Sequence, residues 1–175
     1  MKNIFTVRKI CFVALFTALN TALSSFGIPV PGAHIYLNDT AICFASLILD
    51  PFSAFIVGGV GAFLGDFFFY PAPMFVSLIT HGLQAAAISA ISGKKDKIPP
   101  IKRALLAISV GVLIMVTGYT LGRAFVYSTP QYAISGIPFE FLQAITGAVL
   151  GTVLLYKTPL KKQVMKYIIV PQEKA

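Results

Sequence analysis

The chain has 175 residues, of which 57% are hydrophobic and 11% are charged, and its mean hydropathy is +0.82. A water-soluble domain carries about a quarter charged residues, so this composition excludes one and indicates an integral membrane protein. A hydrocarbon core of ~30 Å needs about 20 apolar residues per helix, which leaves room for about six helices and little else.

The formal net charge of +8 is informative through its placement. All basic residues but one fall in three clusters: Lys2, Arg8 and Lys9; Lys94, Lys95, Lys97, Lys102 and Arg103; Lys157, Lys161, Lys162, Lys166 and Lys174. Basic loops are held in the cytoplasm, so the pattern is a topology signal and indicates no nucleic-acid partner. Six crossings place all three clusters, and both termini, on the cytoplasmic side.

We therefore predict an all-α integral membrane protein, a single domain over residues 1–175. The six expected helices cover residues 9–26, 38–49, 52–69, 72–91, 103–127 and 138–156.

The first helix has two distinct faces. Ala14, Ala18 and Ala22 form a stripe of small residues, which lets a neighbouring helix come close in lipid. Asn20 lies on another face, either as an interhelical hydrogen-bond donor or as a donor to a pocket.

The proline-containing loop after it, residues 27–37, is a candidate lid over a membrane cavity, although we expect His34 simply to be exposed. The next helix is short for a span and either begins nearer His34 or lies tilted within the bundle. Asn38 and Asp39 mark its outer end, as helix caps or as ligand contacts.

Asp50 before Pro51 is the expected N-cap and first-turn pair, so we assign Asp50 a structural role. The helix that follows is rich in glycine, for close packing or to make room for a ligand. Asp66 lies in its last turn, where the helix dipole disfavours an acid, so capping does not explain it. A polar ligand and a structural ion pair are the two alternatives.

Ser77, His81 and Gln84 share one face of the fourth helix. An ionisable group inside a bilayer costs roughly 2.5–3.5 kcal/mol on insertion scales, and such groups usually have a partner or a ligand. His81 is either a hydrogen-bonded core residue or part of a site. Together with Asp66 it makes the segment from Gly58 to Gln84 a predicted wall of a small-molecule site.

Arg123 is the one basic residue outside the clusters. It either snorkels at a helix C-terminus or pairs with Asp66. We expect residues 128–137 to form an outer loop and Pro138 to lie in the first turn of the last helix. Glu140 then falls near its third position, favoured there by the helix dipole or used in the site.

Several kinds of chemistry have no sequence signature. There is no HExxH, GxSxG or P-loop motif, and Cys11 and Cys43 have no metal-ligand spacing. We therefore expect no catalytic residues, metal or cofactor, and no ATP hydrolysis by this chain.

Taken together, the length, the six-helix layout, the alanine stripe, the proline-containing first loop, Asp50-Pro51 and the stretch from Gly58 to Asp66 resemble the S components of energy-coupling factor (ECF) vitamin transporters. The resemblance is greatest to the branch with riboflavin and hydroxymethylpyrimidine S components. It implies a prokaryotic plasma-membrane subunit that binds a vitamin near the outer face, closed by the first loop. It also implies that Ala14, Ala18 and Ala22 dock on a T component joined to two ATPase subunits.

The expected substrate-binding residues are Asn38, Asp39, Asp66, His81, Gln84, Tyr119, Arg123 and Glu140. This acidic, hydrogen-bonding set, with Tyr36, Tyr70 and Tyr119 for stacking, favours hydroxymethylpyrimidine or a pyridoxine-type ring. Riboflavin and pantothenate are the alternative substrates. A membrane scaffold, an intramembrane enzyme and a stand-alone facilitator are the alternative functions.

Overall fold

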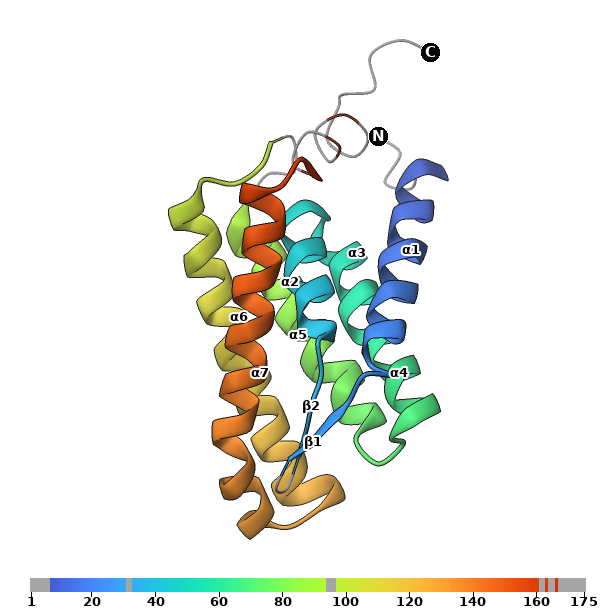
Figure 1. Ribbon diagram of the computed structural model, residues 1–175, viewed down its shortest axis with the longest axis vertical. Coiled ribbons are helices and arrows are strands. Elements are labelled where there is room, and N and C mark those ends of the chain that lie inside the picture. The colour runs from blue at the N-terminus through green and yellow to red at the C-terminus, as the bar shows by residue number, and fades with distance from the viewer. Residues whose placement is uncertain (1–6, 31–32, 94–96, 161–162, 164–165, 167–175) are drawn as a thin grey trace.

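The computed structural model describes residues 7–30, 33–93, 97–160, 163 and 166, which form an elongated bundle of helices (Figure 1). The helices are α1 (Val7–Leu23), α2 (Asn38–Ile48), α3 (Pro51–Phe55), α4 (Gly61–Phe69), α5 (Met74–Ser92), α6 (Ile101–Gly122) and α7 (Pro130–Lys157). Two π-helical turns, η1 (Ile56–Val60) and η2 (Arg123–Tyr127), continue α3 into α4 and extend α6.

Within the described ranges, four helical segments are long and apolar enough to cross a membrane: Pro51–Phe69, Met74–Ser92, Ile101–Tyr127 and Pro130–Lys157. Helix α2 is apolar but has only 11 residues, and α1 has 17. The exposed large side chains along the four long segments are mostly apolar, as expected for surfaces that face lipid.

Helix α2 lies at the centre of the bundle, in contact with α1, α5 and α7 (Figure 1). Every one of its residues except Thr40 is buried. It begins at Asn38, and the chain before it forms an antiparallel hairpin of β1 (Ile28–Val30) and β2 (Ala33–Ile35). The short helix predicted here therefore does not begin near His34, because a strand precedes it.

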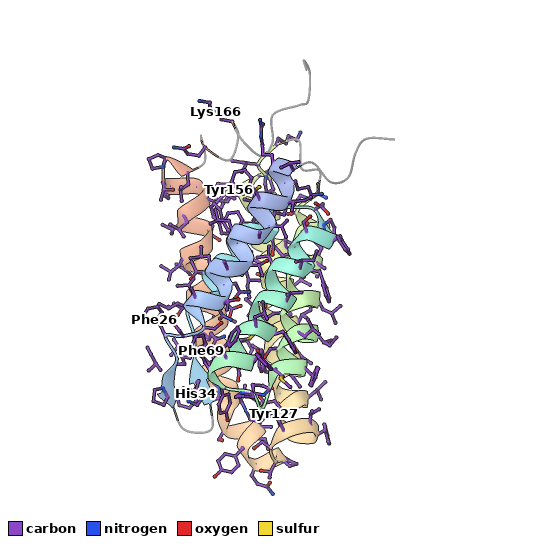
Figure 2. The ribbon with its side chains drawn as sticks, turned by 90° about the vertical axis from the view of Figure 1, so that its right-hand side faces the viewer. Phe26, His34, Phe69, Tyr127, Tyr156 and Lys166 are labelled. Atoms are coloured by element: carbon purple, nitrogen blue, oxygen red, sulfur yellow. The ribbon has the colours of Figure 1, made fainter. Side chains whose placement is uncertain are left out.

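The two ends of the bundle differ. The start of α1 and the end of α7 lie at one end, and the hairpin and the η2 turn lie at the other (Figure 1). In Figure 2, Tyr156 and Lys166 mark the first end, and His34 and Tyr127 mark the second. We call the second the hairpin end.

Glycines set the close contacts between helices. A methyl group on Gly61 of α4 would lie 2.5 Å from the Asn20 side chain of α1, and one on Gly65 would lie 2.5 Å from Ser24. Both distances are shorter than van der Waals contact. On α7, Gly147 and Gly151 lie against Asp39 and Cys43 of α2. Gly61 and Gly65 therefore serve close packing, the first of the two alternatives for the glycine-rich helix.

Asn20 has a structural role. Its Nδ2 donates to the carbonyl oxygens of Val57 and Gly58, at 2.7 and 3.2 Å, in the η1 turn. Asn20 is therefore the interhelical donor of the two alternatives, joining α1 to a turn whose backbone departs from α-helical bonding.

The prediction for the last helix was wrong at its start. Helix α7 begins at Pro130, with Thr129 as its N-cap, so residues 130–137 are helical rather than loop. Pro138 lies inside the helix and not in its first turn. A proline inside a membrane helix is tolerated because neighbouring groups can satisfy the freed carbonyl. Glu140 consequently lies well inside α7, beyond the first turn where the dipole would explain it.

Candidate functional site

A cavity of about 40 Å³ lies at the hairpin end. A cavity needs roughly 10–15 Å³ to hold one water, so this one holds a few waters or a small ring. Its wall combines charged, amide and aromatic side chains: His34, Tyr36, Asp66, Tyr70, Pro73, Tyr119, Arg123, Tyr127, Glu140 and Gln143.

Asp66 of α4 ends a chain of hydroxyl groups. The Ser77 hydroxyl donates to Asp66 Oδ2, and Ser77 Oγ lies 2.5 Å from the Tyr119 hydroxyl oxygen. Because Ser77 has one hydrogen to give, Tyr119 is the donor in the second bond. The other carboxylate oxygen, Asp66 Oδ1, has no hydrogen-bond partner among the described residues.

Arg123 pairs with Glu140 and not with Asp66, so the predicted Asp66–Arg123 pair was wrong. The guanidinium of Arg123 donates to Glu140 Oε1, and both residues are 5% exposed. Arg123 therefore does not snorkel to the surface. Its Nη1 has no hydrogen-bond partner among the described residues and lies against Gly136 of α7.

Asp39 of α2 is held by two glutamine amides. Gln84 Nε2 donates to its Oδ1 at 2.8 Å, and Gln143 Nε2 donates to its Oδ2 at 2.7 Å. Asp39 makes no capping bond, because the N-cap is Leu37 and has no side-chain bond, so the capping alternative was wrong. The carboxylate is fully buried and does not line the cavity.

His81 belongs to the same buried network. Its Nδ1 lies 2.6 Å from Gln84 Oε1. Gln84 directs its amide nitrogen at Asp39, so its oxygen accepts and His81 Nδ1 carries the hydrogen. The His81 ring also meets the Tyr119 ring edge to face, with centroids 5.3 Å apart. The network therefore supports the cavity wall from behind.

Gln143 connects this network to the hairpin. Its Oε1 accepts from the backbone N–H of Tyr36 at 2.9 Å, while its Nε2 holds Asp39. Gln143 is the main residue that the expected set missed. It lies one turn beyond Glu140 on the same helix. A prediction of one continuous helix through both residues would therefore have identified it.

Aromatic side chains close the cavity. The His34 ring lies 4.8 Å from the Tyr70 ring and 6.1 Å from the Tyr36 ring, so His34 is not simply exposed as predicted. Burial raises the pKa of the Tyr36 phenol, and the Asp66 carboxylate raises it further, so the phenol keeps its proton as a donor. Tyr127, at the end of η2, was also absent from the expected set.

The expected residues thus fall into two layers. Asp66, Tyr119, Arg123 and Glu140 line the cavity. Asp39, His81 and Gln84 form the buried network behind it. Asn38 is buried beside them and does not line the cavity, and within the described part of the chain its Oδ1 has no hydrogen-bond partner.

Outside the site, Ala14, Ala18 and Ala22 are all exposed along α1. They line a shallow apolar groove with Ile56 and Leu64. Across the described ranges, no group of His, Cys, Asp and Glu side chains has the arrangement of a metal site.

Residues 4–162 match the family model described as "ECF-type riboflavin transporter, S component". A comparison with curated proteins finds no match.

Proposed function

The chain belongs to the family of S components of ECF-type transporters, the substrate-binding subunits of vitamin importers, and on that premise we propose that its cavity binds a vitamin or vitamin precursor with one small nitrogen-containing ring. The best candidates are hydroxymethylpyrimidine and pyridoxine-type compounds. The observation that carries this proposal is a cavity of about 40 Å³ in which an unpartnered carboxylate oxygen is surrounded by tyrosines.

Asp66 supplies the hydrogen-bond acceptor in this proposal. An amino group or ring N–H on the ligand donates to Asp66 Oδ1, while Ser77, itself held by Tyr119, donates to the other oxygen. The rings of Tyr36, Tyr70 and Tyr127 pack on the ligand ring, since aromatic faces favour offset or tilted contacts. Arg123 and Glu140 complete the wall.

The buried network has a positioning role. Asp39, Gln84 and His81 do not reach the ligand, but they fix Gln143 and the Tyr119 ring, which do line the cavity. Asn38 is expected to act with this network through its unpartnered Oδ1.

Riboflavin is the second candidate, because the matching family model carries that name. Its tricyclic ring and sugar-alcohol chain need more space than the cavity has. Binding it requires the side chains of His34 and Tyr36 on the hairpin side to move outward.

The remaining features of the transporter are also proposals. The chain crosses a prokaryotic plasma membrane six times, with both termini in the cytoplasm. The basic clusters and the common end of α1 and α7 support this topology (Figure 1). Ala14, Ala18 and Ala22 dock on a T component joined to two ATPase subunits, and their exposure along α1 supports that role.

Thermal unfolding of the purified protein against a panel of B vitamins and precursors tests the proposed function. Ligand that binds only the folded state stabilises it by RT ln(1 + [L]/Kd), about 4 kcal/mol at a thousandfold excess over Kd. A large shift with hydroxymethylpyrimidine or pyridoxine supports the proposal. A shift with riboflavin alone transfers the assignment to the second candidate, and no shift with any compound favours a scaffold.

A further inference from the structure

The charges around the cavity do not balance. Three of the lining residues, Asp66, Glu140 and Arg123, carry formal charge. Arg123 and Glu140 form an ion pair and cancel each other. No ion pair in the described part of the chain includes Asp66, whose only hydrogen-bond partner there is the Ser77 hydroxyl. The cavity therefore presents one net negative charge.

The groups behind the wall do not supply the missing cation. Asp39 adds a second buried carboxylate, and its two oxygens are held by the neutral amides of Gln84 and Gln143. His81 Nδ1 donates to Gln84 and lies 3.8 Å from Asp39 Oδ1, so this ring is bonded into the Asp39 network, and no ion pair in the described part of the chain joins it to Asp66. Asp66, on the cavity side, is left for the ligand.

The remaining wall is suited to a cation as well. Four tyrosines, at positions 36, 70, 119 and 127, line the same small space. Faces of aromatic rings attract cations within about 6 Å of the ring centre, and the attraction grows when water is excluded. A carboxylate beside several aromatic rings is an arrangement that binds organic cations.

We infer that this site takes its ligand in a cationic form, as a protonated nitrogen heteroaromatic ring, with Asp66 as the counter-ion and the tyrosine rings as walls. The inference rests on the proposed function and narrows its substrate class. Neutral rings of the same shape should bind more weakly than the cation, and anions should bind more weakly still.

Two probes of one shape and different charge test this inference at neutral pH. The ring nitrogen of 4-aminopyridine is protonated at that pH, whereas aniline is neutral and otherwise matches it closely. We expect the wild-type protein to bind 4-aminopyridine about tenfold more tightly than aniline, measured by isothermal titration or ligand-observed NMR. Equal binding, tighter binding of aniline, or binding of neither probe overturns the inference.

A variant series locates the preference. Asp66→Asn keeps the shape of the side chain and removes its charge, so the two probes should bind it within about twofold of each other. Asp50→Asn removes a carboxylate from the other end of the bundle and should keep the tenfold preference. A preference that survives in folded Asp66→Asn contradicts the role of Asp66. The wild-type comparison stands by itself if that variant does not fold.

If a vitamin stabilises the protein while the protonated probe has no advantage, the cationic inference is wrong and the proposed function remains. If the whole vitamin panel is inert, the proposed function is wrong.

Discussion

Gln143 and Asp39 are 104 residues apart in the sequence, and the amide nitrogen of Gln143 lies 2.7 Å from the Asp39 carboxylate. The oxygen of the same amide accepts from the backbone of Tyr36 at 2.9 Å. One side chain on α7 therefore fixes the start of the central helix α2 and the end of the hairpin. The buried network and the cavity wall are joined at this residue.

Replacing Gln143 should loosen the hairpin as well as the core. Gln143→Leu leaves one Asp39 oxygen without a donor in a buried position, which costs at least about 2 kcal/mol of the free energy of unfolding. It also frees the Tyr36 N–H, so amide hydrogen exchange there should accelerate. Gln84→Leu is the matched control, because it removes one bond from Asp39 and none from the hairpin. Equal exchange at Tyr36 in both variants would contradict this coupling.

Arg123 and Glu140 should behave as one unit. Arg123→Met or Glu140→Gln leaves a buried charge without its partner, and each should cost about 3–5 kcal/mol of unfolding free energy. The double variant should cost clearly less than the sum of the two, in thermal or denaturant unfolding. Asp66→Asn combined with Arg123→Met should be closer to additive. A larger coupling energy between Arg123 and Asp66 than between Arg123 and Glu140 would support the Asp66–Arg123 pair instead.

Gly147 should tolerate no side chain. A methyl group there would meet the Asp39 backbone carbon at 2.8 Å and its Cα at 3.1 Å. Gly147→Ala must therefore push α2 from α7, and overpacking of this kind costs about 1–3 kcal/mol. Leu150→Ala, at an exposed position of the same helix, should change the melting temperature little. A Gly147→Ala protein as stable as the wild type would show that α2 and α7 are not so closely packed.

Asp50, at the other end of the bundle, should give stability that depends on pH. Burial alone would raise the pKa of its carboxyl, but hydrogen bonds from Lys9 and Ser53 hold it below its ordinary value. Such a lowered pKa stabilises the folded state at pH values above the unfolded pKa of about 3.9. This stabilisation is lost as the pH falls through the pKa of the folded state.

The Asp50 substitutions separate its two roles. Asparagine is as good an N-cap as aspartate, so Asp50→Asn removes mainly the Lys9 ion pair, worth at most about 1 kcal/mol for partly exposed groups. Asp50→Ala also removes the cap and should cost about 1 kcal/mol more. The deficit of Asp50→Asn, measured as melting temperature, should be present at pH 7 and shrink steadily as the pH falls below about 4. A deficit that is constant with pH would show that Lys9 does not act through charge.

Hydropathy predicts the long helices well because burial in lipid acts on whole segments. The expected helices 52–69, 72–91 and 103–127 agree with the observed spans within two residues at each end. The Asp50 N-cap is also confirmed, since its side chain accepts from the Ser53 N–H. Such features depend only on neighbouring residues.

Features that depend on the whole bundle were not predicted. Pro138 was interpreted as a helix start because proline favours the first turn, but the bundle carries α7 through it from Pro130. The hairpin has strands of three residues, too short for a pattern of alternation. The two π turns have no sequence signal of their own.

The polar residues of the site could be named from the sequence, but their partners could not. The free-energy cost of a charged side chain inside a membrane identifies Asp39, Asp66 and Arg123 as residues that need a partner. Which partner each one meets depends on the rotation of its helix, set by contacts such as Gly147 with Asp39 and Gly61 with Asn20. For this reason Arg123 was paired with Asp66, whereas it meets Glu140.

The most direct test of the central claim, that Asp66 receives the ring of a small vitamin or precursor, is isothermal titration of hydroxymethylpyrimidine and pyridoxine into three proteins: wild type, Asp66→Asn and Asp50→Asn. Losing a charge-assisted hydrogen bond costs about 1.5–3 kcal/mol, so Asp66→Asn should weaken binding roughly 10- to 150-fold. Asp50→Asn should bind as tightly as the wild type. Unchanged affinity in Asp66→Asn, or no binding of either compound to a wild-type protein that binds riboflavin, would contradict the claim.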